Sequence, residues 1–235
     1  MRFSTLFGDR RPIIGMVHLG PLPGSPRDPG GSDGFPSVLR RATEDAVALK
    51  EGGCDGVMVE NFFDAPFARD QVPPHTLAAM TRAVLAVRDA VGPSFPVGVN
   101  VLRNDARAAL AIAHIASAQF VRINVFVGAA VTDQGIIEGA ARTALLYRRE
   151  LGADVAIFAD IFVKHAASLG GSDYTLEDAA RDAFYRGLAE ALIVSGSATG
   201  MSTDPSVVER VRIAVPEAPV LVGSGFDRRT AAGLL

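Results

Sequence analysis

Short runs of β-branched and other apolar residues alternate along the chain with longer stretches in which apolar residues recur at helical spacing. The pattern predicts seven strands, over Ile13–His18, Gly56–Glu60, Pro96–Leu102, Phe120–Val125, Val155–Val163, Leu192–Ser195 and Val220–Gly223. It predicts helices between them over Val38–Glu51, Thr76–Val91, Ala106–Ala116, Ile136–Leu151, Leu176–Gly187 and Pro205–Val215, with another beginning near Asp227. Strands that alternate with helices indicate parallel βαβ units, so the predicted fold class is α/β.

A doubly wound sheet and a closed TIM (β/α)8-type barrel both fit this alternation, and two observations favour the barrel. Polar residues recur at the carboxyl ends of most predicted strands, as the single catalytic face of a barrel requires. No GxGxxG sequence follows the first strand, although a dinucleotide-binding sheet often has one there. We therefore expect one barrel domain over residues 1–235, C-terminally incomplete because the eighth strand is missing. A truncated coding sequence, completion by another chain or a different architecture would each account for this, and truncation is the interpretation we favour.

The composition narrows the class of protein. Hydrophobic residues make up 49% of the chain, which is enough for a substantial core, and the net charge of −3 disfavours a general nucleic-acid binder. Cys54 is the only cysteine, so neither an intrachain disulfide nor a thiolate zinc cluster can form. Charge occurs too early for a secretory signal, and no apolar stretch reaches the roughly 18 residues that span a bilayer. We expect a cytoplasmic protein without nucleic-acid partner or membrane insertion, and an incomplete barrel has reason to form a homo-oligomer.

Polar and charged side chains that could take part in catalysis or binding occur at the carboxyl ends of the predicted strands. Residues two apart in a strand share a face, which places Arg122 with Asn124 and Asp160 with Lys164. Because a buried lone charge is costly, we predict that Arg122 pairs with Asp160. The predicted catalytic set comprises His18, Glu60, Asn100, Arg122, Asn124, Asp160, Lys164 and His165. The competing interpretation is structural: each side chain would only satisfy local hydrogen bonds, as we expect of Asp64 in a turn and Asp105 at a helix start.

Asp160, Lys164 and His165 are the most closely spaced part of this set. A carboxylate and two bases within six positions can supply general acid–base catalysis, and Lys164 could form a Schiff base with a carbonyl substrate. The alternative is that Lys164 and His165 only position the loop that follows them. A metal site built from His18, Glu60 and Asp160 has weak support, since no HxH or HExxH spacing accompanies it. No cofactor is therefore predicted.

The last third of the chain suggests an anion site. Two predicted strands end in small residues and lead toward a helix start, where backbone N–H groups can approach a ligand closely. Barrels frequently hold phosphate in the loops after strands 7 and 8. The predicted phosphate-binding residues are Gly196, Ser197, Gly223, Ser224 and Gly225. Tight-turn geometry alone is the alternative explanation for these glycines.

Several ordered segments carry a family resemblance: PIIGMVHLGPLPGSP, DGVMVENFFDAPF, PVGVNVLRNDA, FVRINVFVGAAVTDQGIIEG, FADIFVKHA, SGSATG and PVLVGSG. Together they resemble the BtpA/SgcQ family over nearly the whole chain, with Arg11 where the family pattern has lysine. The resemblance implies a TIM barrel related to the ribulose-phosphate-binding group. It also implies that the eight predicted catalytic positions are matched motif positions, without giving any of them a reaction. The family name refers to a factor that affects photosystem I accumulation.

Two classes of function follow from the chain and the resemblance. The first is a protein that binds, and acts on by acid–base chemistry, a small phosphorylated metabolite such as a sugar phosphate or nucleotide; as an enzyme it would be an isomerase, lyase or hydrolase. The second is a non-catalytic assembly or stability factor for a larger complex such as photosystem I. An assembly factor should expose an apolar patch, for which Phe62, Phe63 and Phe67 are candidates, although packing at the barrel rim is the simpler role for them.

Overall fold

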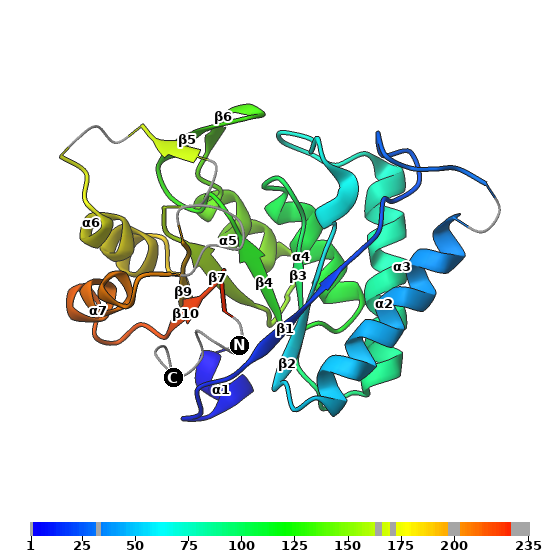
Figure 1. The fold of residues 1–235 in the computed structure, drawn as a ribbon. Coiled ribbons are helices and arrows are strands. Elements are labelled where there is room, and N and C mark those ends of the chain that lie inside the picture. Colours follow the sequence, from blue (N-terminus) through cyan, green and yellow to red (C-terminus); the bar gives the residue numbers. More distant parts are fainter. Residues whose placement is uncertain (1, 32–33, 163–165, 170–172, 197–202, 227–235) are drawn as a thin grey trace. The chain divides into compact units, whose positions relative to one another are not determined.

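The computed structural model describes residues 2–31, 34–162, 166–169, 173–196 and 203–226 (Figure 1). The chain divides into two compact units. Unit 1 comprises Met1–Arg122 and Ala144–Ala156, and unit 2 comprises Ile123–Thr143 and Ile157–Leu235. The boundary between them falls inside β4, α5 and β7. The single domain expected from the sequence stays a prediction, and each unit is described by itself.

Unit 1 is a parallel β/α structure. Its strands pair in the order β1-β2-β3-β4 and every pair is parallel. A helix follows each of the first three strands before the next begins, so these connections are βαβ units. The strands are β1 (Ile14–His18), β2 (Gly56–Glu60), β3 (Val97–Asn100) and β4 (Phe120–Ile123). The helices are α1 (Phe3–Phe7), α2 (Gly34–Glu51), η1 (Phe62–Asp64), α3 (Pro74–Val91), α4 (Ala106–Ile115) and most of α5 (Ala141–Glu150).

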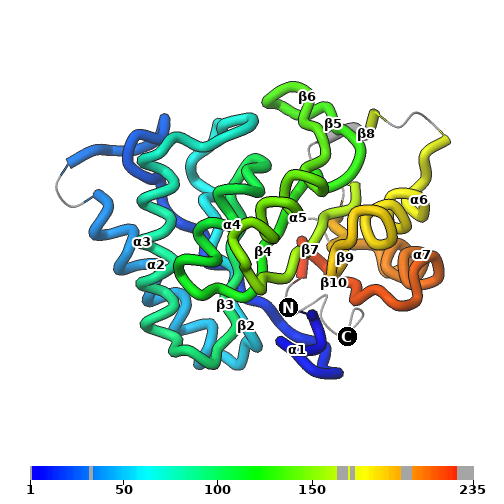
Figure 2. Tube along the Cα trace, turned by 180° about the vertical axis from the view of Figure 1, so that it is seen from behind, coloured from blue at the N-terminus to red at the C-terminus, as the bar shows by residue number. Residues whose placement is uncertain are grey.

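The apolar strands of unit 1 are buried because helices pack against them. Every residue of β2, β3 and β4 is buried. The helices α2 and α3 lie side by side, and α2 contacts β1 and β2 while α4 contacts β3 (Figures 1 and 2). Burial of this kind explains why these strands are continuous apolar runs and not alternating ones. Asp105 caps α4 by accepting the Ala108 N–H at 2.9 Å, as the sequence predicted.

Unit 2 combines a parallel and an antiparallel sheet. The parallel strands pair in the order β7-β9-β10, and the antiparallel strands in the order β6-β5-β8. The strands are β5 (Ala129–Thr132), β6 (Gly135–Glu138), β7 (Ala156–Asp160), β8 (Ala166–Ser168), β9 (Ala191–Val194) and β10 (Val220–Val222). The helices are α6 (Leu176–Arg181), the π-helical turn η2 (Asp182–Arg186) and α7 (Pro205–Ala214).

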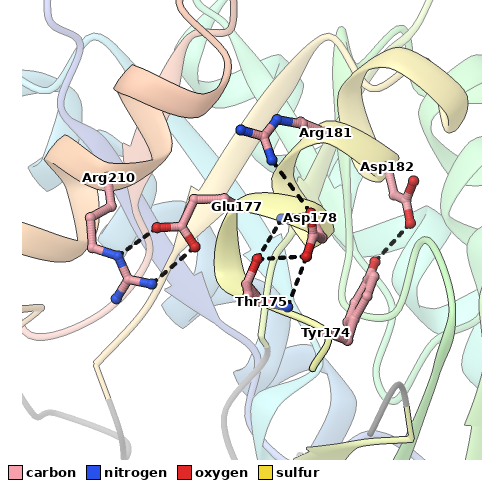
Figure 3. A network of polar contacts seen from close by, with 7 residues as sticks. All are labelled: Tyr174, Thr175, Glu177, Asp178, Arg181, Asp182 and Arg210. Atoms are coloured by element: carbon pink, nitrogen blue, oxygen red, sulfur yellow. Dashed lines mark hydrogen bonds and ion pairs between the residues drawn. The ribbon is translucent and has the colours of Figure 1, made fainter. Parts of the chain in front are cut away.

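Two helix starts of unit 2 are the ones that the sequence predicted. Thr175 and Asp178 form a capping box at α6, in which each side chain bonds the backbone N–H of the other residue. Asp204 accepts the Ser206 N–H at 2.9 Å, and Pro205 occupies the first turn of α7. The two helices contact each other, and Arg210 of α7 donates two hydrogen bonds to Glu177 of α6, at 2.6 and 3.0 Å (Figure 3).

The sequence prediction was wrong about the segment after β4. A helix was expected over Ile136–Leu151, but residues 135–138 form strand β6 and the helix α5 begins at Ala141. The cause is the turn before β6: Gly135 has φ of +100°, and Val131 faces Ile136 across an antiparallel pair. Ala130 and Ile137 on the other face are buried together with Val125. This tertiary burial outweighs the weak helical period of GIIEGAARTALL, because the short apolar run alternates equally well as a strand.

Candidate functional site

Unit 1 brings three of the predicted residues together at the carboxyl ends of adjacent strands. His18 ends β1, Glu60 ends β2 and Asn100 ends β3, and each lies directly opposite the next in the strand register. Asn100 Nδ2 donates to Glu60 Oε2 at 2.7 Å, and His18 Nε2 lies 3.7 Å from Glu60 Oε1. The Glu60 carboxylate therefore has one oxygen held by an amide and the other directed at the imidazole. We call these three residues the histidine cluster.

Solvent exposure in the histidine cluster increases from Asn100 through Glu60 to His18. Asn100 is 1% exposed and Glu60 is 5% exposed, whereas the His18 side chain is 38% exposed. Asn100 Oδ1 is buried and has no hydrogen-bond partner. Phe62 stacks on His18 with ring centroids 4.4 Å apart and an interplanar angle of 19°. An imidazole that reaches solvent and is oriented by a buried carboxylate is an arrangement suited to proton transfer.

Arg122 lies in the same row of unit 1, because it is the register partner of Asn100 on β4. Its side chain is buried, at 9% exposure, as expected of a charged residue that has a partner. Asp160, with which it was predicted to pair, belongs to unit 2. The Arg122–Asp160 pair therefore stays a prediction.

The loop that follows His18 is fastened by Asp64, which the sequence had placed only in a turn. Asp64 Oδ1 accepts the Leu22 N–H at 2.8 Å, and its Oδ2 accepts Asn61 Nδ2 at 3.1 Å. Asn61 Oδ1 in turn accepts the Leu102 N–H at 2.7 Å. Burial raises the pKa of Asp64 above its usual value, against the lowering effect of these hydrogen bonds. Asp64 and Asn61 thus join the three loops that follow β1, β2 and β3.

Unit 2 holds a second carboxylate–amide pair. Asn124 follows β4 and Asp160 ends β7, and Asn124 Nδ2 donates to Asp160 Oδ2 at 2.6 Å. Asn124 is 4% exposed and Asp160 is 5% exposed. Asn124 Oδ1 is buried without a hydrogen-bond partner, as Asn100 Oδ1 is in unit 1. The amide orientation follows from the chemistry, since only the NH₂ group can face a carboxylate.

Asn124 and Asp160 line a small pocket of unit 2 that is open to solvent. The other residues that line it are apolar or aromatic, among them Val125, Phe126, Ala130, Ile161, Phe162 and Tyr174. Phe162 and Tyr174 meet edge to face, with ring centroids 6.3 Å apart. Tyr174 donates its hydroxyl to Asp182 at 3.0 Å (Figure 3), and burial together with this bond raises the pKa of Tyr174 to about 12. We call this space the aromatic pocket.

The described part of the predicted phosphate site lies at neighbouring strand ends of unit 2. Gly196 lies two residues beyond β9, and Gly223, Ser224 and Gly225 follow β10, which pairs with β9. The Gly223 N–H donates to Val194 O at 2.7 Å, so this amide continues the sheet. Gly225 has φ of +65°, a conformation that glycine adopts readily. Asp204 caps α7, which makes that helix start itself unsuited to an anion.

Three predicted site residues, Lys164, His165 and Ser197, lie outside the described residues. Among the residues that the structure describes, no group of three or more His, Cys, Asp or Glu side chains could hold a metal ion. Within the same part of the chain, no helix has both the length and the apolar character needed to cross a membrane.

Sequence reasoning missed the aromatic partners of both carboxylate–amide pairs. Phe62 was considered for an exposed patch or rim packing, but its ring lies on His18. Strand parity put Phe162 on the same face as Asp160, and both line the pocket, but Phe162 was assigned no role from the sequence. Tyr174 lies 14 residues beyond Asp160, and no pattern in the sequence connects the two. Only the folded chain places Tyr174 in the wall of the aromatic pocket.

The chain matches known proteins over nearly its whole length. A family model described as the BtpA family matches residues 9–235. The photosystem I biogenesis protein BtpA of Synechocystis sp. is 47% identical over 233 residues, which cover 99% of this chain and 78% of that protein. An uncharacterized protein of Thermococcus kodakarensis is 48% identical over 219 residues, which cover 92% of this chain and 79% of that protein.

Solved structures show the fold. A putative phosphonomutase from Burkholderia cenocepacia superposes with a TM-score of 0.58 at 17% identity, covering 95% of this chain and 82% of that one. OMP decarboxylase from Leishmania donovani superposes with a TM-score of 0.54 at 18% identity, covering 94% of this chain and 79% of that one. Both are TIM-barrel enzymes, so the predicted α/β fold of the TIM (β/α)8 type is confirmed. Seven parallel strands occur among the described residues, and all seven were predicted.

Proposed function

Since the chain belongs to the BtpA family, we propose that it binds a small phosphorylated metabolite and acts on it by acid–base chemistry. The observation that supports this most directly is the Asn124–Asp160 pair. It is buried, it lines an open pocket, and one of its polar atoms has no partner within the protein. A buried polar atom without a partner costs free energy, and a ligand group that donates to it recovers that cost.

The phosphate half of the proposal rests on the topology of unit 2. Asp160 ends β7, and the strand order β7-β9-β10 places the Gly223–Gly225 loop two strands away along the same sheet edge. Parallel strands have their carboxyl ends together, and each strand adds about 4.8 Å, so the span is on the order of 10 Å. A molecule with a phosphate at one end and a reacting group at the other has this length. Glycine-rich loops at strand ends are common phosphate sites in barrels.

Unit 1 by itself holds a group suited to proton transfer, the histidine cluster. Glu60 keeps its carboxylate in place through Asn100 and directs the other oxygen toward His18. The imidazole can then exchange a proton with solvent, since it is the exposed member of the three. Isomerisation, elimination and hydrolysis all require such a step.

The test is a thermal-shift titration with ribose 5-phosphate and inorganic phosphate against two variants of one residue. Ser224→Glu adds a negative charge at the proposed phosphate loop, and Ser224→Gln adds the same bulk without charge. A ligand at one hundred times its dissociation constant stabilises a protein by about 2.7 kcal/mol. We expect ribose 5-phosphate to stabilise the original protein and Ser224→Gln, and to lose its effect on Ser224→Glu. Equal responses of the two variants, or no response of the folded original protein, would overturn the proposal.

Assembly of a larger complex is a second candidate function, and one observation favours it. Val131 and Ile136 face each other across the β5–β6 pair, and they are 42% and 54% exposed. Exposed apolar pairs of this kind occur at protein interaction surfaces. The relative from Synechocystis sp. is named for photosystem I biogenesis. On this proposal Val131→Asp would abolish co-elution with photosystem I subunits and would leave the ribose 5-phosphate response unchanged.

A further inference from the structure

The polar end of the aromatic pocket offers hydrogen-bond acceptors. Asn124 Nδ2 donates to Asp160, and Asn124 Oδ1 is an acceptor to which no group donates. Asp160, when ionised, is itself an acceptor. A phosphate placed here would set its oxygens against the acceptor Asn124 Oδ1, whereas an N–H or O–H group would donate to it. The pocket therefore suits the donor-bearing end of a ligand and not its phosphate.

The side chains that line the pocket favour a flat heterocyclic ring over a sugar as its ligand. Apart from Asn124 and Asp160, all the described residues that line it are apolar or aromatic, and Tyr174 already donates its hydroxyl to Asp182. Several sugar hydroxyls against such walls would lose hydrogen bonds to water without replacing them, at a cost for each. A heterocycle presents apolar faces to the walls and N–H donors only at its edge. Phe162 is 41% exposed and borders the pocket, so its ring is available for stacking.

The separation of the two ends agrees with this choice. Two strand spacings separate Asp160 from the Gly223–Gly225 loop, a distance on the order of 10 Å. A nucleoside monophosphate extends about this far from the edge of its base to its phosphorus, since a ribose lies between them. Ribose 5-phosphate is shorter by the length of the base. The span from Asp160 to the loop therefore agrees with the length of a nucleoside monophosphate.

We propose that the aromatic pocket binds the heterocycle of a nucleotide, with an N–H donor of the ring edge on Asn124 Oδ1 and a ring face against Phe162. This inference rests on the proposed function, from which it takes the phosphate loop, and it selects nucleotides over simple sugar phosphates. Uncharged nucleosides should also bind, more weakly than their monophosphates.

The test is isothermal titration with AMP, GMP, CMP, UMP, their four nucleosides and ribose 5-phosphate. We expect at least one nucleoside monophosphate to bind roughly tenfold or more tightly than ribose 5-phosphate. Phe162→Leu keeps an apolar side chain but removes the flat ring. It should weaken that nucleotide by roughly threefold to tenfold and leave ribose 5-phosphate unchanged. Ile213→Ala, which removes an exposed apolar side chain of α7 away from the pocket, is the control and should change neither.

The outcomes separate this inference from the proposed function. If ribose 5-phosphate binds, loses binding on Ser224→Glu, and equals or exceeds every nucleotide, the inference is overturned and the proposed function stands. If nucleosides bind as tightly as their monophosphates and Phe162→Leu weakens them, the inference stands and the phosphate loop is refuted. If Phe162→Leu weakens the binding of nucleotide and of ribose 5-phosphate equally, the inference is overturned, because the substitution would then act through the structure of the protein and not through stacking. Binding of no probe overturns both.

Discussion

The two units of the molecule contain the same hydrogen-bonded pair in different surroundings. In unit 1 Asn100 donates to Glu60 at 2.7 Å, and in unit 2 Asn124 donates to Asp160 at 2.6 Å. All four residues are buried, and both amide oxygens lack a partner. Beside the first pair lies the imidazole of His18, and beside the second lies a pocket with Phe162 and Tyr174 in its wall.

The comparison shows that the pair itself does not define a chemistry. An amide that holds a carboxylate fixes the position and rotation of both groups, at the cost of a buried acceptor. On the proposals made above, the neighbouring imidazole serves proton transfer beside one pair, whereas the apolar and aromatic walls serve ligand recognition beside the other. The role of each pair therefore depends on residues that come from other strands and loops.

The largest effect is expected from a substitution that disturbs the strand under the unit 1 pair. Gly98 lies two residues before Asn100, and a Cβ atom there would overlap the ring of Phe120. Gly98→Ala must displace a buried phenylalanine, so we expect the free energy of unfolding to fall by about 3 kcal/mol. Urea unfolding measures this. Gly34→Ala is the control, because its new Cβ would meet nothing nearer than 3.9 Å and should cost less than about 0.5 kcal/mol.

A fall of less than about 1 kcal/mol for Gly98→Ala would contradict this packing. It would mean that Phe120 can move aside and that β3 does not depend on the glycine to hold Asn100 in register with Glu60.

The next effect compares the two pairs directly by double-mutant cycles. Alanine replaces Glu60, Asn100 or both in unit 1, and Asp160, Asn124 or both in unit 2. Hydrogen bonds to buried charged groups contribute about 1.5–3 kcal/mol, so both cycles should give coupling energies in this range. The exposed pair of Arg69 and Asp70, 2.8 Å apart, is the control and should couple by less than about 0.5 kcal/mol. A coupling energy in either unit as small as that of Arg69 and Asp70 would show that the two buried pairs are not equivalent.

The smallest effect is expected from an exposed counterpart of these pairs. Arg210 lowers the pKa of Glu177 to about 2, mainly through their hydrogen bonds (Figure 3). Because the folded-state pKa lies below the usual 4.5, the stabilisation is present at neutral pH and is lost as the pH falls from about 4.5 toward 2. The melting temperature of the original protein should exceed that of Glu177→Gln at pH 7, and the difference should vanish near pH 2.

The control for the Glu177–Arg210 pair is Glu209→Gln on α7, the helix that carries Arg210. Glu209 lies 3.9 Å from Arg212. A difference between the original protein and Glu177→Gln that stays constant from pH 7 to pH 2 would show that the bond between Glu177 and Arg210 is not ionic in solution.

The sequence predicted the strands well because their signal is local. Apolar runs such as GVMVE and VGVN bury every residue, and covering helices make this pattern typical of parallel sheets. The helix starts at Thr175 and Asp204 were likewise predictable, since a cap is formed by residues within one turn. The failure at residues 135–138 has the opposite cause: whether a short apolar run is strand or helix depends on the partner strand, here β5.

The amino-acid sequence by itself thus determined the α/β class, the parallel strands and the polar identity of the strand ends, because each follows from neighbours along the chain. Tertiary structure alone decided that Asn100 belongs to Glu60 and Asn124 to Asp160, and that Phe62 lies on His18. It also placed Tyr174 in a pocket with Asp160. These contacts join residues tens of positions apart, and their partners are fixed by strand register and loop course, which no local pattern encodes.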